Sequence, residues 1–138
     1  MTNVNDAVSL PKDRQPTLRL VPMPADTNHE GSVFGGWIMS QVDMAGSIPA
    51  IKRARGRVAT VAVESFEFHQ PVFVGDLISC YADVMKVGRT SITVKVEVFA
   101  ERRTQPGQCI KVTEAILTYV ALDENCRTRL VPPEGHGP

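Results

Sequence analysis

The chain has 138 residues and a mass of 15.1 kDa, with 43% hydrophobic residues, and its 15 Lys and Arg balance its 15 Asp and Glu. This length predicts one globular domain that buries about two thirds of its unfolded surface. A net charge of zero without a long basic run argues against nucleic-acid binding and against a polybasic membrane anchor.

Both ends of the chain are rich in Pro, Gly and polar residues and lack hydrophobic periodicity. Residues 1–14 and 129–138 are therefore predicted to be flexible tails around one domain at residues 15–128. The N-terminus lacks the apolar segment of a signal peptide, and no stretch is apolar enough to span a bilayer. We expect a cytoplasmic protein without a membrane partner. An odd number of widely spaced cysteines favours reduced thiols at small buried positions. These cysteines are Cys80, Cys109 and Cys126.

A short strand is predicted at Thr17–Val21, followed by a turn-rich loop at Pro22–Ser32. From Gly35 to Arg55, apolar residues recur at spacings of three and four, which predicts a helix with one face in the core. Pro49 should kink this helix or end its regular part. The expected core stripe consists of Ile38, Val42, Ala45, Ile48 and Ile51, and a small-residue surface for close packing on a sheet of Ala45, Gly46 and Ala50.

Four β-rich runs follow the helix, separated by short segments that contain Pro or Gly. Such connections favour an antiparallel meander. The fold class is predicted to be α+β, with a curved antiparallel sheet wrapped around a single central helix. The first and fourth runs are long, and an exposed edge of that length indicates pairing with another subunit. The runs are Arg57–Phe68, Leu77–Lys86, Ser91–Glu101 and Gln108–Leu122.

Several common catalytic motifs are absent from the sequence: there is no nucleophile elbow, phosphate loop, dinucleotide motif or zinc-ligand spacing. No metal site is therefore expected. The three histidines are far apart, and a lone histidine is by default structural or solvated. Among them, His29 is the strongest functional candidate, ahead of His69 and His136.

The polar segment at residues 26–47 leads into a glycine pair that opens a helix with an internal carboxylate. Free N–H groups at Gly35 and Gly36 could bind a developing oxyanion. Asp43 lies on nearly the same helix face, about 10 to 12 Å farther along the axis. One chain cannot close that gap, but two antiparallel helices of a dimer could form composite sites. Ser47, one turn beyond, could hold a water.

The residues of this proposed site also have simpler structural interpretations. A glycine pair before a helix is often only a tight turn, and an internal Asp often faces solvent. The apolar neighbours of Asp43 nevertheless predict a buried helix, in which an unpaired carboxylate is unfavourable. Asn28 would by default form an Asx turn, Asp26 would cap the loop, and Trp37 would anchor the core.

A second candidate cluster lies in the turn Lys86–Ser91, where two basic side chains and two hydroxyls could meet a phosphate. An ordinary hairpin with solvated charges explains the same pattern. Other candidates for an anionic ligand are Arg57, Arg127 and Arg129.

The segment DTNHEGSVFGGWIMSQVDMAG resembles the hotdog-fold acyl-CoA thioesterases, and within them the YciA-like bacterial group. The resemblance continues through GRVATVAVESFEF, PVFVGDLISCYADVMKVGRTSITVKVEVF and the last strand, so it covers residues 15–128. It implies a hotdog fold, homodimers with a continuous sheet, and trimers of such dimers. The implied reaction is hydrolysis of an acyl-CoA thioester to a free acid and CoA.

By motif position, the resemblance implies that Asp43 is the general base, or a nucleophile that forms a mixed anhydride. Asn28 would contact the thioester carbonyl or the water, and Gly35 or Gly36 would donate to the oxyanion from the partner subunit. Pro49 departs from the family pattern, which leaves the straightness of the helix open.

The resemblance also implies that the CoA pantetheine follows the strand backbone at residues 57–60 and that the phosphates lie near basic side chains. CoA is then part of the substrate, with no metal or redox cofactor. The expected CoA-binding residues are Arg57, Val58, Thr60, Lys86, Val87, Gly88, Arg89, Thr90 and Ser91.

Two other functions fit the same fold. An enoyl-thioester hydratase or dehydratase would need an Asp/His pair, and His29 is the only histidine near the motif. A non-catalytic acyl-CoA binding or sensor module would use the same groove without Asp43.

Overall fold

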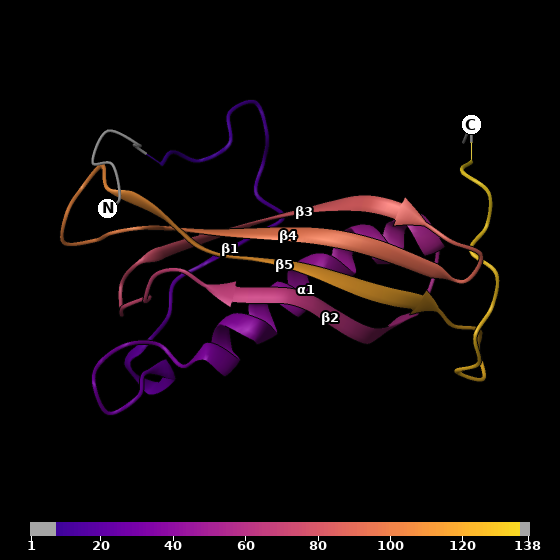
Figure 1. Ribbon diagram of the computed structural model, residues 1–138, viewed down its shortest axis with the longest axis horizontal. Coiled ribbons are helices and arrows are strands. Elements are labelled where there is room, and N and C mark those ends of the chain that lie inside the picture. The colour runs from indigo at the N-terminus through magenta and orange to yellow at the C-terminus, as the bar shows by residue number, and fades with distance from the viewer. Residues whose placement is uncertain (1–7, 136–138) are drawn as a thin grey trace.

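The structure is a computed structural model that describes residues 8–135. A five-stranded antiparallel sheet covers one long helix, α1, as Figure 1 shows. This arrangement confirms the predicted α+β fold. In chain order the elements are β1 (Leu18–Leu20), the 3-10 helix η1 (Pro24–Asp26), α1 (Gly35–Ala54), β2 (Val58–Phe68), β3 (Leu77–Val87), β4 (Ser91–Glu101) and β5 (Cys109–Ala121).

Helix α1 runs through Pro49 to Ala54, so the proline does not end it. It stops where Arg55 adopts a left-handed conformation, with φ 55°. The predicted core stripe is correct in its first half only, because Ile48 and Ile51 are exposed. The 3.6-residue period turns these two side chains away from the sheet. Small residues continue the buried stripe instead: Gly46, Ala50 and Ala54.

The strand order is β1-β3-β4-β5-β2, so the expectation of a four-strand meander is wrong for β2. The link at residues 69–76 crosses the end of the sheet rather than making a hairpin. It pairs with the loop before α1, where Val33 N donates to Val72 O at 2.8 Å. Consequently β5 lies inside the sheet, and of the two strands expected as edges only β2 is one.

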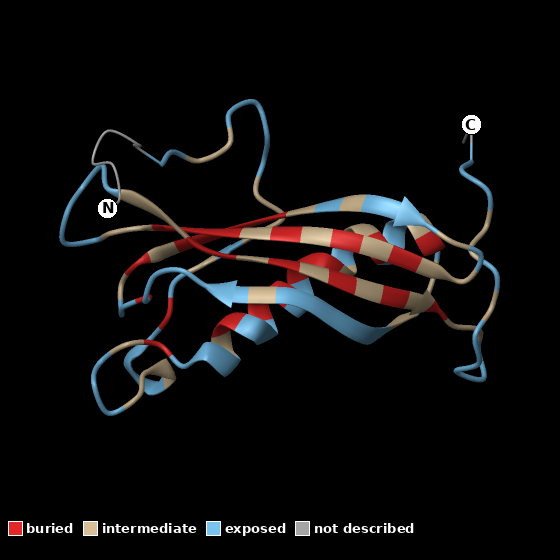
Figure 2. Ribbon diagram, in the orientation of Figure 1, coloured by how far each residue is buried: buried red, intermediate tan, exposed pale blue. Residues whose placement is uncertain are grey.

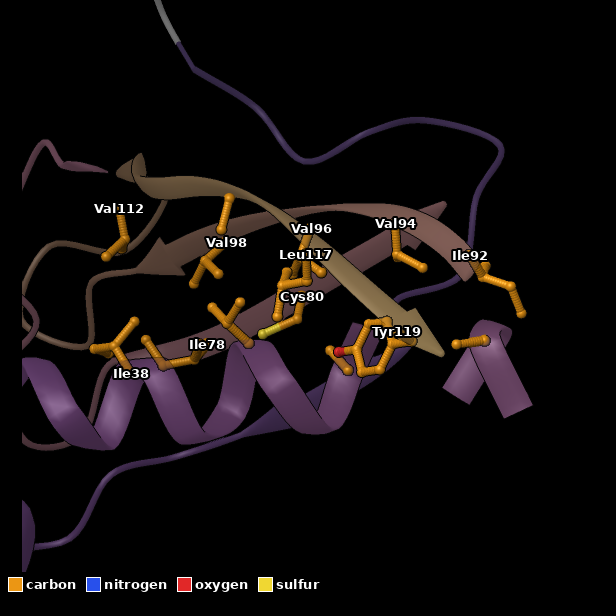
Figure 3. Packing of buried hydrophobic residues seen from close by; sticks show 14 of the residues in the cluster. Ile38, Ile78, Cys80, Ile92, Val94, Val96, Val98, Val112, Leu117 and Tyr119 are labelled. Atoms are coloured by element: carbon orange, nitrogen blue, oxygen red, sulfur yellow. The ribbon is translucent and has the colours of Figure 1, made fainter. Parts of the chain in front are cut away.

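The core lies between α1 and the central strands, where alternate residues of β4 and β5 are buried (Figure 2). Ile92, Val94, Val96 and Val98 of β4 face the helix in one row (Figure 3). Most of β2 is exposed, by contrast, including its apolar residue Val61. The sheet therefore ends in a long, partly apolar edge.

The thiols do not share one environment. Burial raises the pKa of Cys80 to about 12, and burial followed by the charge of Glu101 raises the pKa of Cys109. Cys109 is only partly buried, and Cys126 is exposed in the turn after β5, so the expectation that all three cysteines are buried is correct for Cys80 alone.

Segments beyond the predicted domain boundaries also make contacts. Arg14 pairs with Asp83 at 2.7 Å, and Arg53 donates to the carbonyl of Pro132 at 2.6 Å. Within residues 8–135, no helix has the length and apolar character needed to cross a bilayer.

Candidate active site

Asp43 accepts hydrogen bonds from two side chains of the sheet. Thr60 Oγ1, on β2, donates to Asp43 Oδ1 at 2.6 Å. The hydroxyl of Tyr119, on β5, lies 3.1 Å from the same oxygen and 2.8 Å from the main-chain oxygen of Asp43. Thr60 and Tyr119 are partners in the β2–β5 register, so both reach the helix from one row of the sheet. Within residues 8–135, Oδ2 of Asp43 has no side-chain or loop donor.

A β-bulge sets the direction of Thr60. The register shifts between Thr60 and Ala62, so that Val61 has no partner on β5. In a regular strand, residues three apart face opposite sides. The extra residue allows both Thr60 and Val63 to line the same cavity beneath the sheet.

The cavity at Asp43 has a volume of about 230 Å³ and is mostly apolar. Asp43 itself is exposed within one chain, so the sequence argument that it sits in a fully buried helix face is wrong for the isolated subunit. Its apolar neighbours Val42 and Ala45 point into the core while Asp43 faces the open side. The lining residues are Met39, Ser40, Val42, Asp43, Thr60, Val63, Phe66 and Leu117.

The start of α1 borders a second cavity, of about 360 Å³. Phe34 is the N-cap and provides no side-chain cap. The loop and cap hydrogen bonds of the described residues include none donated by the N–H of Gly35 or Gly36, as expected for the first turn of a helix. Both glycines are exposed. Their amides are thus available to an anionic group.

Asn28 forms the Asx turn that its sequence context favours. Its Oδ1 accepts from the backbone N–H groups of Glu30 at 2.9 Å and Ser32 at 3.2 Å. Its Nδ2 donates to Ser32 Oγ at 3.0 Å. An amide nitrogen carries two hydrogens, so the second remains for another acceptor. Asp26 Oδ2 accepts from Met23 N at 2.8 Å, in keeping with the predicted cap.

Among the described residues of one chain, no residue lines both cavities. The Phe66 ring borders the first and the Phe68 ring borders the second, and the two rings stack edge to face at 4.9 Å. A single chain therefore does not bring Asp43 and the glycine amides into one cavity, as their spacing on the helix predicts.

Ser47 lies outside the Asp43 cavity, and its hydroxyl donates to the carbonyl of Met44 at 2.7 Å. Ser40, about two turns before Ser47, lines the cavity instead. Trp37 is partly buried and packs against the core, consistent with an anchor.

The turn Lys86–Ser91 lies at the same end of the sheet as Asp43. Ile92 on β4 pairs with Tyr119, and Tyr119 pairs with Thr60. The turn is closed by a bond from Gly88 N to Ser91 O at 2.7 Å, and Ala121 N donates to Thr90 O at 2.9 Å. The side chains of Lys86 and Arg89 are exposed.

The other arginines predicted to bind an anionic ligand differ in whether their side chains are exposed. Arg57 is exposed and contacts Cys126 Sγ at 3.6 Å. Arg129 instead donates to the carbonyls of Leu122 and Ala54, at 2.8 and 2.7 Å, and so ties the chain end to α1. Arg127 is exposed in the turn after β5.

Neither of the two described histidines, His29 and His69, forms a hydrogen bond or ion pair with Asp43. His29 is exposed in the loop before α1, and His69 lines the cavity at Gly35. His136 lies outside the described residues. Among residues 8–135, no group of three His, Cys, Asp or Glu side chains could hold a metal ion.

Sequence reasoning missed Tyr119 as a partner of Asp43 and placed Thr60 with the coenzyme only. Tyr119 lies on a strand whose alternation marks it as a core residue, so its hydroxyl gave no separate signal. The available hint was Gly46, an internal helix glycine that makes room for a bulky neighbour.

Comparisons with known proteins agree with this fold. A family model of the thioesterase superfamily matches residues 30–106. The chain is 51% identical over 121 residues to an uncharacterized acyl-CoA thioester hydrolase from Haemophilus influenzae, covering 86% of this chain and 79% of that protein. It is 47% identical to the acyl-CoA thioester hydrolase YciA of Escherichia coli, covering 85% of this chain and 90% of YciA.

Solved structures are similar as well. The hexameric thioesterase y2039 from Yersinia pestis has a TM-score of 0.83 and 46% identity, covering 91% of this chain and 100% of that chain. The acyl-CoA hydrolase from Staphylococcus aureus, in complex with butyryl coenzyme A, coenzyme A and coenzyme A disulfide, has a TM-score of 0.76 and 30% identity. That match covers 83% of this chain and 70% of that chain.

Proposed function

The chain belongs to the thioesterase superfamily, and from this premise we propose that it hydrolyses acyl-CoA thioesters to a free carboxylic acid and CoA. The observation that carries the proposal is the Asp43 carboxylate, which Thr60 and Tyr119 hold through Oδ1 and which lines a mostly apolar cavity. A fixed carboxylate beside an apolar wall suits attack on an acyl carbonyl, because a partner subunit and substrate that cover its open side would exclude water and leave its charge available for chemistry.

Two routes use this carboxylate. As a general base, Asp43 takes a proton from water while the water oxygen attacks the thioester carbon. As a nucleophile, Asp43 attacks that carbon itself, and water then hydrolyses the mixed anhydride. In both routes the carbonyl oxygen becomes negative, the C–S bond breaks, and the CoA thiolate leaves and takes up a proton. The amide groups of Gly35 and Gly36 would stabilise the oxyanion, and the second amide hydrogen of Asn28 would contact the carbonyl or the water.

We propose that each site combines two subunits of a homodimer. Asp43 would come from one subunit, and Asn28, Gly35 and Gly36 from the other. The separation of the two cavities within one chain supports this arrangement, as does the open edge of β2. A trimer of such dimers is the proposed assembly, in line with the hexameric thioesterase y2039.

The proposed path of CoA runs from Asp43 toward the basic turn. Pantetheine would follow the backbone at Arg57, Val58 and Thr60, and the phosphates would meet the turn Lys86–Ser91. The shared strand row of Thr60, Tyr119 and Ile92 supports this path. Hydrolysis by a carboxylate and water requires no metal or redox cofactor, and we propose a cytoplasmic enzyme without a nucleic-acid or membrane partner.

A substrate panel tests the function. The purified protein is incubated with saturated acyl-CoA thioesters of short to long chain and with an enoyl-CoA, and free thiol release and hydration are followed separately. Thiol release from the saturated substrates is expected, with a maximum that identifies the preferred chain length. Hydration without thiol release would indicate a hydratase, and binding without turnover would indicate a binding module; either result would overturn the proposal.

A further inference from the structure

Tyr119 places a polar hydroxyl in an otherwise apolar core. Its side chain is among the largest fully buried ones, and Figure 3 shows its ring reaching from β5 to α1. The hydroxyl hydrogen is shared between two acceptors of one residue, the main-chain oxygen and Oδ1 of Asp43. Because the first acceptor belongs to the helix backbone, the hydroxyl ties the carboxylate to a rigid element.

Helix α1 is built to admit this hydroxyl. A Cβ atom at Gly46 would lie 2.4 Å from the Tyr119 hydroxyl oxygen, well inside contact distance. Glycine within a helix is less stable than alanine because it loses more conformational freedom on folding. Glycine at position 46 therefore weakens the helix locally but leaves room for the contact between Tyr119 and Asp43.

We propose that Tyr119 is a positioning residue of the thioesterase site: together with Thr60 it holds Oδ1 of Asp43, so that Oδ2 is the oxygen directed at the reacting water or thioester carbon. Gly46 is the space that makes this contact possible. The inference rests on the proposed role of Asp43 and adds to it which oxygen reacts and what orients it.

The electrostatics keep Tyr119 in its donor form. Burial, the negative charge of Asp43 and the hydrogen bond to Asp43 all raise the pKa of Tyr119 above its usual range. The hydroxyl thus stays protonated wherever a thioesterase is assayed. Without the hydrogen bond from Tyr119, the Asp43 carboxylate would rotate more freely about its side-chain torsions. Such a change affects the rate, because misplacement of a catalytic group by about 1 Å can lower a rate by about 100-fold.

The test uses the two tyrosines of the chain as a matched pair. Tyr119→Phe removes only the hydroxyl at Asp43, whereas Tyr81→Phe makes the same change at a buried site on β3 beside Phe99. We expect Tyr119→Phe to lower kcat by about tenfold or more with KM within about twofold, and Tyr81→Phe to leave both unchanged. An unchanged kcat in Tyr119→Phe, or an equal loss in Tyr81→Phe, would overturn the inference.

A second pair of variants keeps the test valid if Tyr119→Phe is unstable. Thr60→Val removes the other donor to Oδ1, and Thr60→Ser restores it, so Ser should recover kcat where Val does not. Gly46→Ala should lower kcat in the parent but much less in Tyr119→Phe, because the clashing hydroxyl is already gone. Additive losses of Gly46→Ala and Tyr119→Phe would contradict the inference.

Asp43→Ala separates this inference from the proposed function. If Asp43→Ala stays active, the role of Asp43 and the inference both fail. If Asp43→Ala is inactive while Tyr119→Phe keeps the parent kcat, only the positioning role fails.

Discussion

The ring of Phe68 lies over Gly35, so that a Cβ atom at Gly35 would sit 3.3 Å from two ring carbons, whereas a Cβ at the adjacent Gly36 meets nothing within 4 Å. The two glycines at the start of α1 therefore differ in how much room a side chain would have at each position. Within the subunit, Gly35 is confined by the aromatic wall of its cavity. Among residues 8–135, no atom would sterically limit a side chain at Gly36.

Gly36→Ala accordingly tests the oxyanion role of the helix amides. The variant should fold with an unchanged or slightly higher Tm, because alanine favours the helix. If substrate approaches the amide, the new methyl group should lower kcat/KM by about tenfold or more. Steady-state kinetics and thermal unfolding of Gly36→Ala measure both. Full activity in this variant would show that substrate does not come close to Gly36.

The edge strand β2 should hold the dimer together. Val61, 56% exposed on this strand, would face the partner, and Val61→Asp should place a charge in that interface. We expect a monomer of about 15 kDa by light scattering and loss of thioesterase activity, since the site would lack its second half. Met85→Asp, on β3 near the opposite edge, is the control and should retain the dimer. A fully active Val61→Asp monomer would rule out composite sites.

A buried ion pair stabilises the link between β2 and β3. Asp76 is buried and binds the Arg102 guanidinium as well as Phe73 N, and Arg102 also lies over the Phe73 ring at 4.8 Å. Arg102→Leu leaves this carboxylate without its partner, which should lower the free energy of unfolding by about 3–5 kcal/mol. Arg103→Leu, at an exposed neighbour, should change it by about 0.5 kcal/mol or less. Urea unfolding compares the two, and equal effects would refute the ion-pair account.

Two glutamates face each other across β4 and β5, and neighbouring lysines balance their negative charges. Glu97 pairs with Glu114 in the register, and Lys111 donates to both, at 2.9 and 3.2 Å. Hydrogen bonds from Lys95 and Lys111 lower the pKa of Glu114. A lowered folded-state pKa stabilises the protein above the unfolded value of about 4.3, and this contribution is lost as pH falls through the folded-state pKa.

Glu114→Gln should therefore destabilise the protein more at pH 7 than at pH 3. Glu114 is partly exposed, so solvent screening limits the loss at pH 7 to about 0.2–1 kcal/mol. Thermal unfolding at both pH values measures the difference, with Glu124→Gln as an exposed control that forms no ion pair within residues 8–135. A destabilisation of equal size at both pH values would argue against the charge as its cause.

Hydrophobic periodicity along the sequence predicted the bounds of the helix and of the strands closely. The alternation at Ile92, Val94, Val96 and Val98 gave β4 its observed bounds, and the 3.6-residue period gave α1 to within one residue. The position of β2 next to β5 could not be predicted in this way, because it depends on pairing between segments far apart in the chain. A short link at residues 69–76 permits either neighbour, and its contacts with the loop before α1 decide between them.

The site was predictable where spacing along one helix determined it. The relation of Gly35 to Asp43 follows from helical rise alone, and the structure keeps the two residues in different cavities. Tyr119 lies 76 residues from Asp43 in sequence, so only the folded sheet brings its hydroxyl to the carboxylate. The outward position of Ile48 and Ile51 was missed because the small residues beside them gave a weaker hydrophobic signal.

The most direct test of the central claim is thiol release from the best acyl-CoA substrate by the parent protein and by Asp43→Ala, with folding and CoA binding measured in parallel. We expect kcat of the variant to fall by about 100-fold or more while its Tm, oligomeric mass and affinity for CoA are retained. A folded Asp43→Ala protein that hydrolyses the substrate at the parent rate would contradict this claim.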